Sequence, residues 1–156
     1  MQGDAAVVRV LNDVLTAELT SVNQYFVDAK MFANWGYDKL AGHFHEESID
    51  EMKDADVLIE RILFLDGVPN VQRLSPVRIG ENLGEKLEAA KVLEIEAIAR
   101  LNEGIATCVA SGDDRSRQLL STILEGEERH LDWVETQLGL VAQLGETAYL
   151  SQQIGA

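Results

Sequence analysis

Four long segments whose apolar residues recur every three or four positions constrain the fold of this chain most strongly. That spacing is the period of a helix that buries one face, and no segment shows the strict alternation of a half-buried strand. The segments cover about 4–35, 38–66, 81–112 and 113–138. Each ends at a glycine, a residue that favours helix ends: Gly36, Gly67, Gly112 and Gly139. The chain is therefore predicted to be all-α, with a short fifth helix over about 146–154.

The connections predict how these helices pack. Short breaks at Gly36 and Gly112 favour two antiparallel helical hairpins. The stretch 67–80 contains both prolines and reaches roughly 45 Å when extended, which matches a helix of about 28 residues, roughly 42 Å long. It can therefore cross the whole bundle and make the second and third helices parallel. One such crossover is typical of the ferritin-like four-helix bundle, predicted here as a single domain over 1–156.

Acidic residues interrupt the apolar stripes at matching positions of the two hairpins. An offset of 76 residues relates Gly36 to Gly112 and also three pairs of polar residues: Glu18 and Glu94, Glu51 and Glu127, and Asp54 and His130. A single acid in such a stripe is most simply an edge residue that reaches solvent. Several convergent carboxylates with a histidine need cations, because an unpaired buried charge is very costly.

The ligand types suit iron, manganese or zinc. A Glu from each of two helices, with Glu-x-x-His from the other two, is the known arrangement of ferritin-like di-iron proteins. The predicted metal ligands are Glu18, Glu51, Asp54, Glu94, Glu127 and His130. Glu51 and Glu127 are the most natural bridging pair.

Composition excludes several other classes of function. The net charge of −14 and the absence of a basic tail argue against nucleic-acid or anionic-membrane partners. The single Cys108 suits a reducing compartment, and the first residues lack the pattern of a signal peptide, so we expect a cytoplasmic protein. No apolar run approaches the roughly 20 residues that a membrane span requires. One cysteine also excludes the Cys-x-x-Cys iron domain of a rubrerythrin-like peroxidase.

Several motifs resemble those of bacterioferritins along essentially the whole chain. They are NQYF at 23–26, MFANWG at 31–36, ESIDEM at 47–52, IERILFLDGVPN at 59–70 and HLDWVETQL at 130–138. The resemblance implies iron storage and detoxification in a hollow shell of 24 subunits. Each subunit would act as a ferroxidase, oxidising Fe(II) with O₂ or H₂O₂ at an internal di-iron centre, and the shell would hold ferric mineral. A small ferredoxin-type electron donor for iron release would fit this family.

The resemblance also assigns roles to single residues. It carries Glu18, Glu51, Glu94, Glu127 and His130 over as the di-iron ligands. Tyr25, seven residues after Glu18, would lie beside the centre as a hydrogen-bonding or one-electron partner. An ordinary core tyrosine is an equally good interpretation of that position.

Met52 is turned by about 100° from Glu51 on the helix, so it belongs to a second, outward stripe that suggests contact with another subunit. From the residues alone, a methionine there is usually packing. The bacterioferritin resemblance implies instead that it ligates a haem b shared by two subunits. Lys53 would pair with a propionate. The pocket would be lined by Leu19, Val22, Asn23, Phe26, Ile49 and Ile59.

The chain departs from the family at two positions, since Asp54 and Glu46 stand where histidine is usual or frequent. Glu46, Glu47 and Asp50 still offer iron an acidic inner surface, although a solvated helix face explains them equally well. Positions that line a pore in the family are Asn34, Asp66, Asn70 and Asp132. Because of Asp54, an alternative stays open: a haem-binding subunit with a weakened ferroxidase site, which co-assembles with a complete subunit in a hetero-oligomer.

Overall fold

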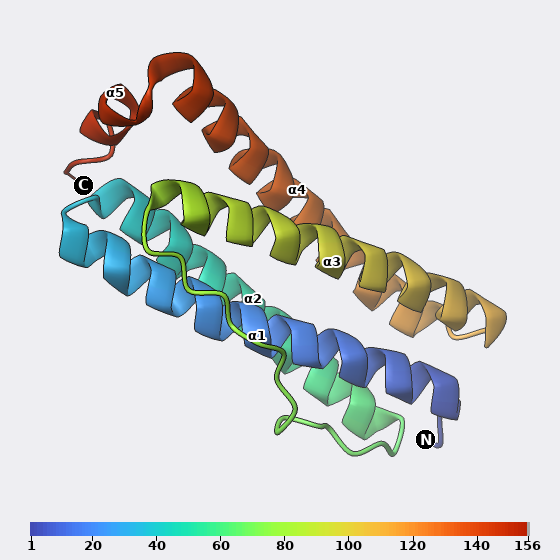
Figure 1. Cartoon of the computed structure of the whole chain (residues 1–156). Coiled ribbons are helices and arrows are strands. Elements are labelled where there is room, and N and C mark those ends of the chain that lie inside the picture. Colours follow the sequence, from blue (N-terminus) through green and yellow to red (C-terminus); the bar gives the residue numbers. More distant parts are fainter. Residues whose placement is uncertain (156) are drawn as a thin grey trace.

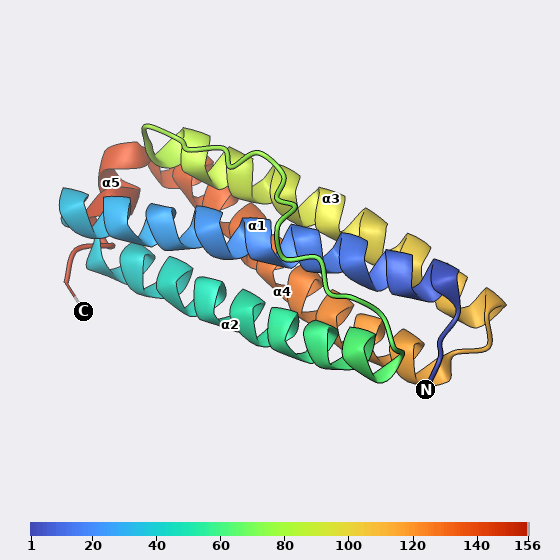
Figure 2. The same cartoon turned by 90° about the horizontal axis from the view of Figure 1, so that it is seen from below.

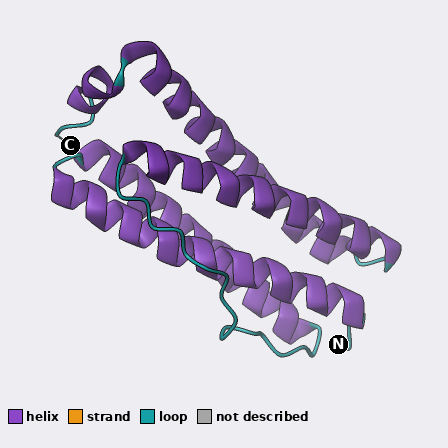
Figure 3. Ribbon diagram, viewed as in Figure 1, coloured by secondary structure: helices purple, strands orange, loops and turns teal. Residues whose placement is uncertain are grey.

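Five helices make up the computed structural model, which describes residues 1–155 (Figures 1 and 3). They are α1 (Ala5–Trp35), α2 (Asp38–Phe64), α3 (Leu83–Ala110), α4 (Asp114–Leu144) and α5 (Glu146–Ser151). No strand occurs among the described residues, which confirms the all-α prediction. Ala156, the last residue of the predicted domain, lies outside them. None of these helices combines the length and the apolar character needed to span a bilayer.

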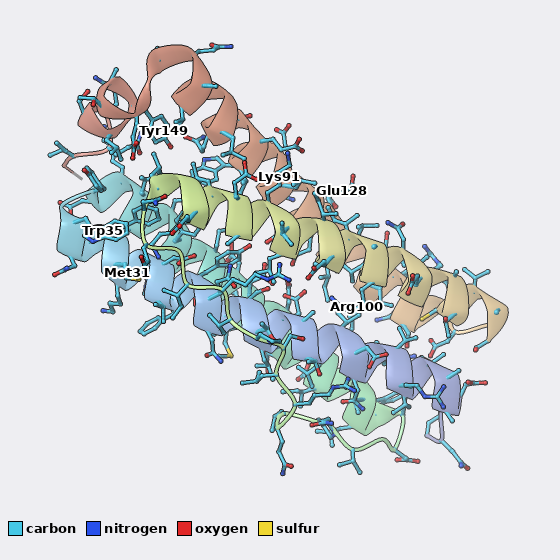
Figure 4. All side chains as sticks on the ribbon, viewed as in Figure 1. Met31, Trp35, Lys91, Arg100, Glu128 and Tyr149 are labelled. Atoms are coloured by element: carbon cyan, nitrogen blue, oxygen red, sulfur yellow. The ribbon has the colours of Figure 1, made fainter. Side chains whose placement is uncertain are left out.

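The helices form two antiparallel hairpins, α1–α2 and α3–α4, packed side by side (Figures 1 and 2). The connection from α2 to α3 runs the length of the bundle, so that α2 and α3 point the same way, as predicted. The short α5 folds back at one end of the bundle. There the hydroxyl of Tyr149 donates to Oε1 of Gln137 on α4 at 2.6 Å (Figure 4). The fold is the expected ferritin-like bundle.

The long crossover is attached to α1 by polar side chains spaced four residues apart. Asn12, Thr16, Thr20 and Gln24 lie on one face of α1, because four residues are close to one helical turn. Thr20 Oγ1 accepts from the amide of Ser75 at 3.0 Å, and Gln24 Oε1 accepts from the amide of Arg78 at 3.1 Å. Asn12 and Thr16 make corresponding bonds to Asn70 and Arg73. This polar face explains why the connection lies along the bundle.

Two apolar clusters fill the bundle and leave a polar level between them. One contains Leu11, Leu58 and Ile62, and the other contains Phe32, Phe44 and Leu87. Residues 18, 51, 94 and 127 fall between these clusters along their helices. The carboxylates therefore occupy the middle of the bundle, flanked by packed apolar side chains on both sides.

The helix ends differ from the predicted ones in instructive ways. The helix predicted to stop at Leu138 continues through Gly139 to Leu144, where Gly145 has a φ of 83°. An interior glycine costs a helix only about 1 kcal/mol, and the good helix formers beyond it outweigh that cost. The second helix ends at Phe64 rather than at about 66, and the third begins at Leu83 because Asn82 caps it. The last helix ends at Ser151 rather than at about 154.

Candidate metal centre

All four long helices contribute carboxylates to one buried cluster. Glu18, Glu51, Glu94 and Glu127 are at most 3% exposed, and each comes from a different helix. One carboxylate oxygen each from Glu18, Glu51, Asp54 and Glu127 lies within 4.8 Å of the others. The sequence alone left open whether the shorter aspartate could reach the cluster. Asp54 lies close enough to join Glu18, Glu51 and Glu127 around a cation.

The other half of the cluster is built around Glu94. His130 Nδ1 lies 3.0 Å from Glu94 Oε1, and the hydroxyl of Tyr25 donates to the same oxygen. Burial alone would raise the pKa of Glu94, but hydrogen bonds with Glu127, His130 and Tyr25 lower it below its ordinary value. The lowered pKa favours the charged carboxylate of Glu94. Burial raises the pKa of Tyr25 well above its ordinary value, so that its hydroxyl keeps the proton with which it orients Glu94.

Within this cluster, four buried carboxylate oxygens have no hydrogen-bond partner among the described residues. They are Oε2 of Glu18, Glu51, Glu94 and Glu127. A buried acceptor without a partner is expensive, and four in one cluster are exceptional. Divalent cations would satisfy all four oxygens. Oxygen donors with one imidazole are also the ligand set that iron and manganese accept, so the residues fit the predicted metals.

Without cations, the cluster retains protons. The pKa of Glu51 is raised well above its ordinary value by burial and by the charge of Glu94. Burial and the neighbouring Glu51 raise the pKa of Glu127 well above its ordinary value in the same way. Burial, followed by the charges of Asp50, Glu47 and Glu94, raises the pKa of Asp54 to about 7. These protons must leave when a cation binds, so cation affinity should rise with pH.

The metal-free chain should lose stability as the pH rises from about 4 to above 7. Asp54 binds its proton more tightly in the folded chain, where its pKa is about 7, than in the unfolded chain, where it is near 3.8. Its contribution is therefore complete below pH 4 and is lost as the pH rises through 7. Thermal unfolding in the presence of a chelator would show a falling midpoint, and Asp54→Asn should flatten this dependence. An equal slope in both proteins would contradict the prediction.

The residues predicted to line a haem lie on the outer face of the α1–α2 hairpin. Met52, Phe26 and Ile49 are 48%, 45% and 44% exposed. Leu19, Val22 and Ile59 are partly buried, while Asn23 and Lys53 are exposed. Met52 therefore faces away from Glu51, as the helical spacing predicted, and belongs to an exposed apolar patch.

The residues predicted for the inner surface and the pore are mostly at the surface of the single chain. Glu46 and Asp50 are exposed, whereas Glu47 is partly buried with Oε2 3.6 Å from His130 Nδ1. Asn34 and Asp132 are exposed. Asn70 and Asp66 have local structural roles: Asn70 Oδ1 accepts from the amide of Arg73, and Asp66 pairs with the N-terminal amine at 3.3 Å.

Sequence analysis overlooked His43. Its Nε2 lies 3.0 Å from Nε2 of His130, and its ring stacks on Trp133 with centroids 3.4 Å apart. Burial and the neighbouring His130 lower its pKa to about 3. A signal was present, because His43, Glu47 and Glu51 are spaced by four and continue the metal-bearing face of α2 toward its N-terminus.

Comparison with known proteins agrees with this geometry. The ferritin-like domain model of the ferritin family matches residues 8–144. A bacterioferritin of Mycobacterium leprae is 48% identical over 152 residues, covering 97% of this chain and 96% of that protein. A bacterioferritin of Streptomyces coelicolor is 49% identical over 154 residues, covering 99% and 92%. One of Brucella melitensis is 46% identical over 149 residues, covering 96% and 92%. The chain therefore belongs to the ferritin family and, within it, to the bacterioferritins.

Proposed function

We propose that this iron-storage protein oxidises Fe(II) at the buried carboxylate cluster and stores the ferric product inside a multisubunit shell. Membership of the bacterioferritins supports the storage role. The observation that carries the ferroxidase role is the set of four buried carboxylate oxygens without partners. Such an arrangement is costly in an empty protein and becomes favourable when two divalent cations bind between the helices.

Each hairpin holds one iron position. Glu18 and Asp54 of the first hairpin would bind one Fe(II) substrate ion, and Glu94 and His130 of the second would bind the other. Glu51 and Glu127, which lie beside each other in the cluster, would be shared by the two positions. When bound there, two Fe(II) ions supply the electrons that reduce O₂ or H₂O₂.

The protein's own part is to position groups and to move protons. Glu51, Asp54 and Glu127 give up their protons when Fe(II) binds, since their raised pKa values favour the protonated form beforehand. Tyr25 holds Glu94 in place through its hydroxyl. The flanking apolar clusters cover this level of the bundle from both ends, so that solvent reaches it from the side, through the pocket lined by Glu51, Asp54 and Glu127.

The exposed patch around Met52 supports a haem b between two subunits. A thioether is a suitable axial ligand for haem iron, and Phe26 and Ile49 offer apolar surface to a porphyrin. Burying these side chains against a second copy would remove exposed apolar area from water. We extend the proposal to the family's 24-subunit shell, in which α5 provides contacts near the ends of the bundles.

Asp54 decides between a competent ferroxidase and a weakened subunit that needs a complete partner. Its place in the cluster with Glu18, Glu51 and Glu127 favours the competent form, with an all-oxygen first position. Asp54→Ala should therefore lower the initial rate of Fe(II) oxidation at least tenfold. Losing a residue that only hydrogen-bonds to a metal ligand already costs about tenfold or more, and losing a ligand should cost no less. Asp54→His should oxidise Fe(II) at least as fast as Asp54→Ala because imidazole restores a ligand.

Stopped-flow oxidation after anaerobic Fe(II) loading tests this proposal, with light scattering to measure the assembly. A parent chain that is monomeric would remove the shell, and one that oxidises Fe(II) no faster than the buffer would remove the ferroxidase role. If Asp54→Ala matches an active parent chain and Asp54→His exceeds it, Asp54 is no ligand and the weakened-subunit alternative is correct.

A further inference from the structure

A second group of metal-ligand side chains lies beside the carboxylate cluster, toward the N-terminus of α2. His43 and Glu47 are one turn apart on α2, and His130 faces them from α4. One ligand atom from each of the three lies within 4.8 Å of the others. The two Nε2 atoms are 3.0 Å apart. At the tetrahedral angle usual for zinc, two nitrogens each about 2.1 Å from the ion would be about 3.4 Å apart, so the two rings need to separate by only a few tenths of an ångström to hold it.

The rings that carry these nitrogens are held in place. His43 is nearly parallel to Trp133, with an interplanar angle of 12°, and meets the Phe44 ring edge to face. His130 is wedged between Trp133 and Tyr25. Side chains locked by such packing lose little entropy when they bind a cation. The arrangement is therefore preorganised.

Solvent reaches this group through a pocket of about 470 Å³. The same pocket is lined by His43, Glu47 and His130 and by three residues of the carboxylate cluster, Glu51, Asp54 and Glu127. A cation that enters here meets His43 and Glu47, which are partly buried, beside the fully buried Glu51 and Glu127. Water in the pocket can complete its coordination.

We propose that His43, Glu47 and His130 form a third cation site, for a divalent transition metal such as Zn²⁺ or Fe²⁺, at the pocket side of the carboxylate cluster. Two imidazoles and one carboxylate are a common protein ligand set for these ions. His43 is the residue that defines the site, because the proposed function gives it no other task.

His130 is a ligand both of the third site and of the dinuclear centre, so it can serve only one of them at a time. This part of the proposal rests on the proposed function. A neutral imidazole has one nitrogen with a free lone pair. When His130 Nε2 binds the third cation, its Nδ1–H donates to Glu94, which lies 3.0 Å away. When Nδ1 instead binds beside Glu94, Nε2–H donates to His43. A cation at the third site can therefore keep His130 as a ligand only while Nε2 has the free lone pair, and it loses this ligand when His130 changes tautomer and binds the centre through Nδ1.

Crystals of the full chain soaked in Zn²⁺, with anomalous data at the zinc edge, test both parts. We expect a peak between His43, Glu47 and His130 in addition to peaks among the carboxylates. His43→Phe keeps an aromatic ring against Trp133 and should remove only the first peak. His45→Phe, a matched change at an exposed histidine two residues away, should keep all of them.

The outcomes separate this inference from the proposed function. Peaks among the carboxylates with none beside His43 would overturn the third site and leave the dinuclear centre standing. A peak beside His43 alone would support the third site and count against the dinuclear centre. Zinc at neither place would overturn both. Full occupancy on both sides of His130 in one crystal would support the site but overturn the exchange, because one neutral ring cannot serve two cations.

Discussion

Replacing Glu127 by glutamine should abolish rapid Fe(II) oxidation, with a loss of initial rate of about 100-fold or more, beyond the range of outer-shell changes. Glu127 lies in the cluster with Glu18, Glu51 and Asp54, and it also hydrogen-bonds with Glu94 of the other half. Its substitution therefore weakens both iron positions at once. Stopped-flow oxidation and anaerobic Fe(II) titration would measure the loss of rate and of binding.

The variant should fold normally. Glutamine matches the size of glutamate, and burial already raises the pKa of Glu127 well above its ordinary value, so the metal-free protein carries a nearly neutral side chain there. Glu128→Gln makes the same change at the adjacent, exposed residue, labelled in Figure 4, and should oxidise Fe(II) like the parent chain. If Glu127→Gln also retains the parent rate, oxidation takes place somewhere other than this cluster.

Met52→Leu should remove essentially all haem. Leucine conserves most of the volume and the apolar surface but has no atom that can ligate iron. Since Met52 is 48% exposed on the single chain, the change leaves the bundle core untouched and the subunit contact largely intact. The Soret absorbance per subunit, after expression with ample haem supply, measures the effect. Light scattering should show the same assembly as the parent.

Met31→Leu is the matched control for this experiment. Met31 lies on α1 and is partly buried, and its sulfur accepts a contact from Lys86 Nζ of α3 at 3.2 Å. Its haem content should equal that of the parent chain. Equal haem in the Met52 and Met31 variants would show that the haem is bound elsewhere or not at all.

Periodicity was sufficient to predict the bundle because long helices repeat one signal many times. The crossover was predictable for a different reason, since a proline-containing stretch of that reach has few other paths. Helix ends were harder to predict. Gly139 looked like a stop, but local propensity alone cannot weigh one glycine against the favourable residues that follow it.

The convergence of the carboxylates was predictable from their register in the apolar stripes, whereas their surroundings were not. His43 reaches His130 only because α2 and α4 face each other, a relation that no spacing within one helix reveals. The ion pair of Lys86 with Asp28, at 2.8 Å and almost fully buried, is another such case. Contacts between helices depend on rotation and crossing geometry, and these are set by the whole core.

The division of labour between the two hairpins has an evolutionary consequence. Glu18 and Asp54 come from the first hairpin, while Glu94 and His130 come from the second. A substitution at one of these four residues would therefore alter one of the proposed iron positions and spare the ligands specific to the other, whereas a change at Glu51 or Glu127 would affect both. Exchange of histidine and aspartate needs only one nucleotide. A site divided in this way would let natural selection adjust the ligands of one position while those specific to the other stay unchanged.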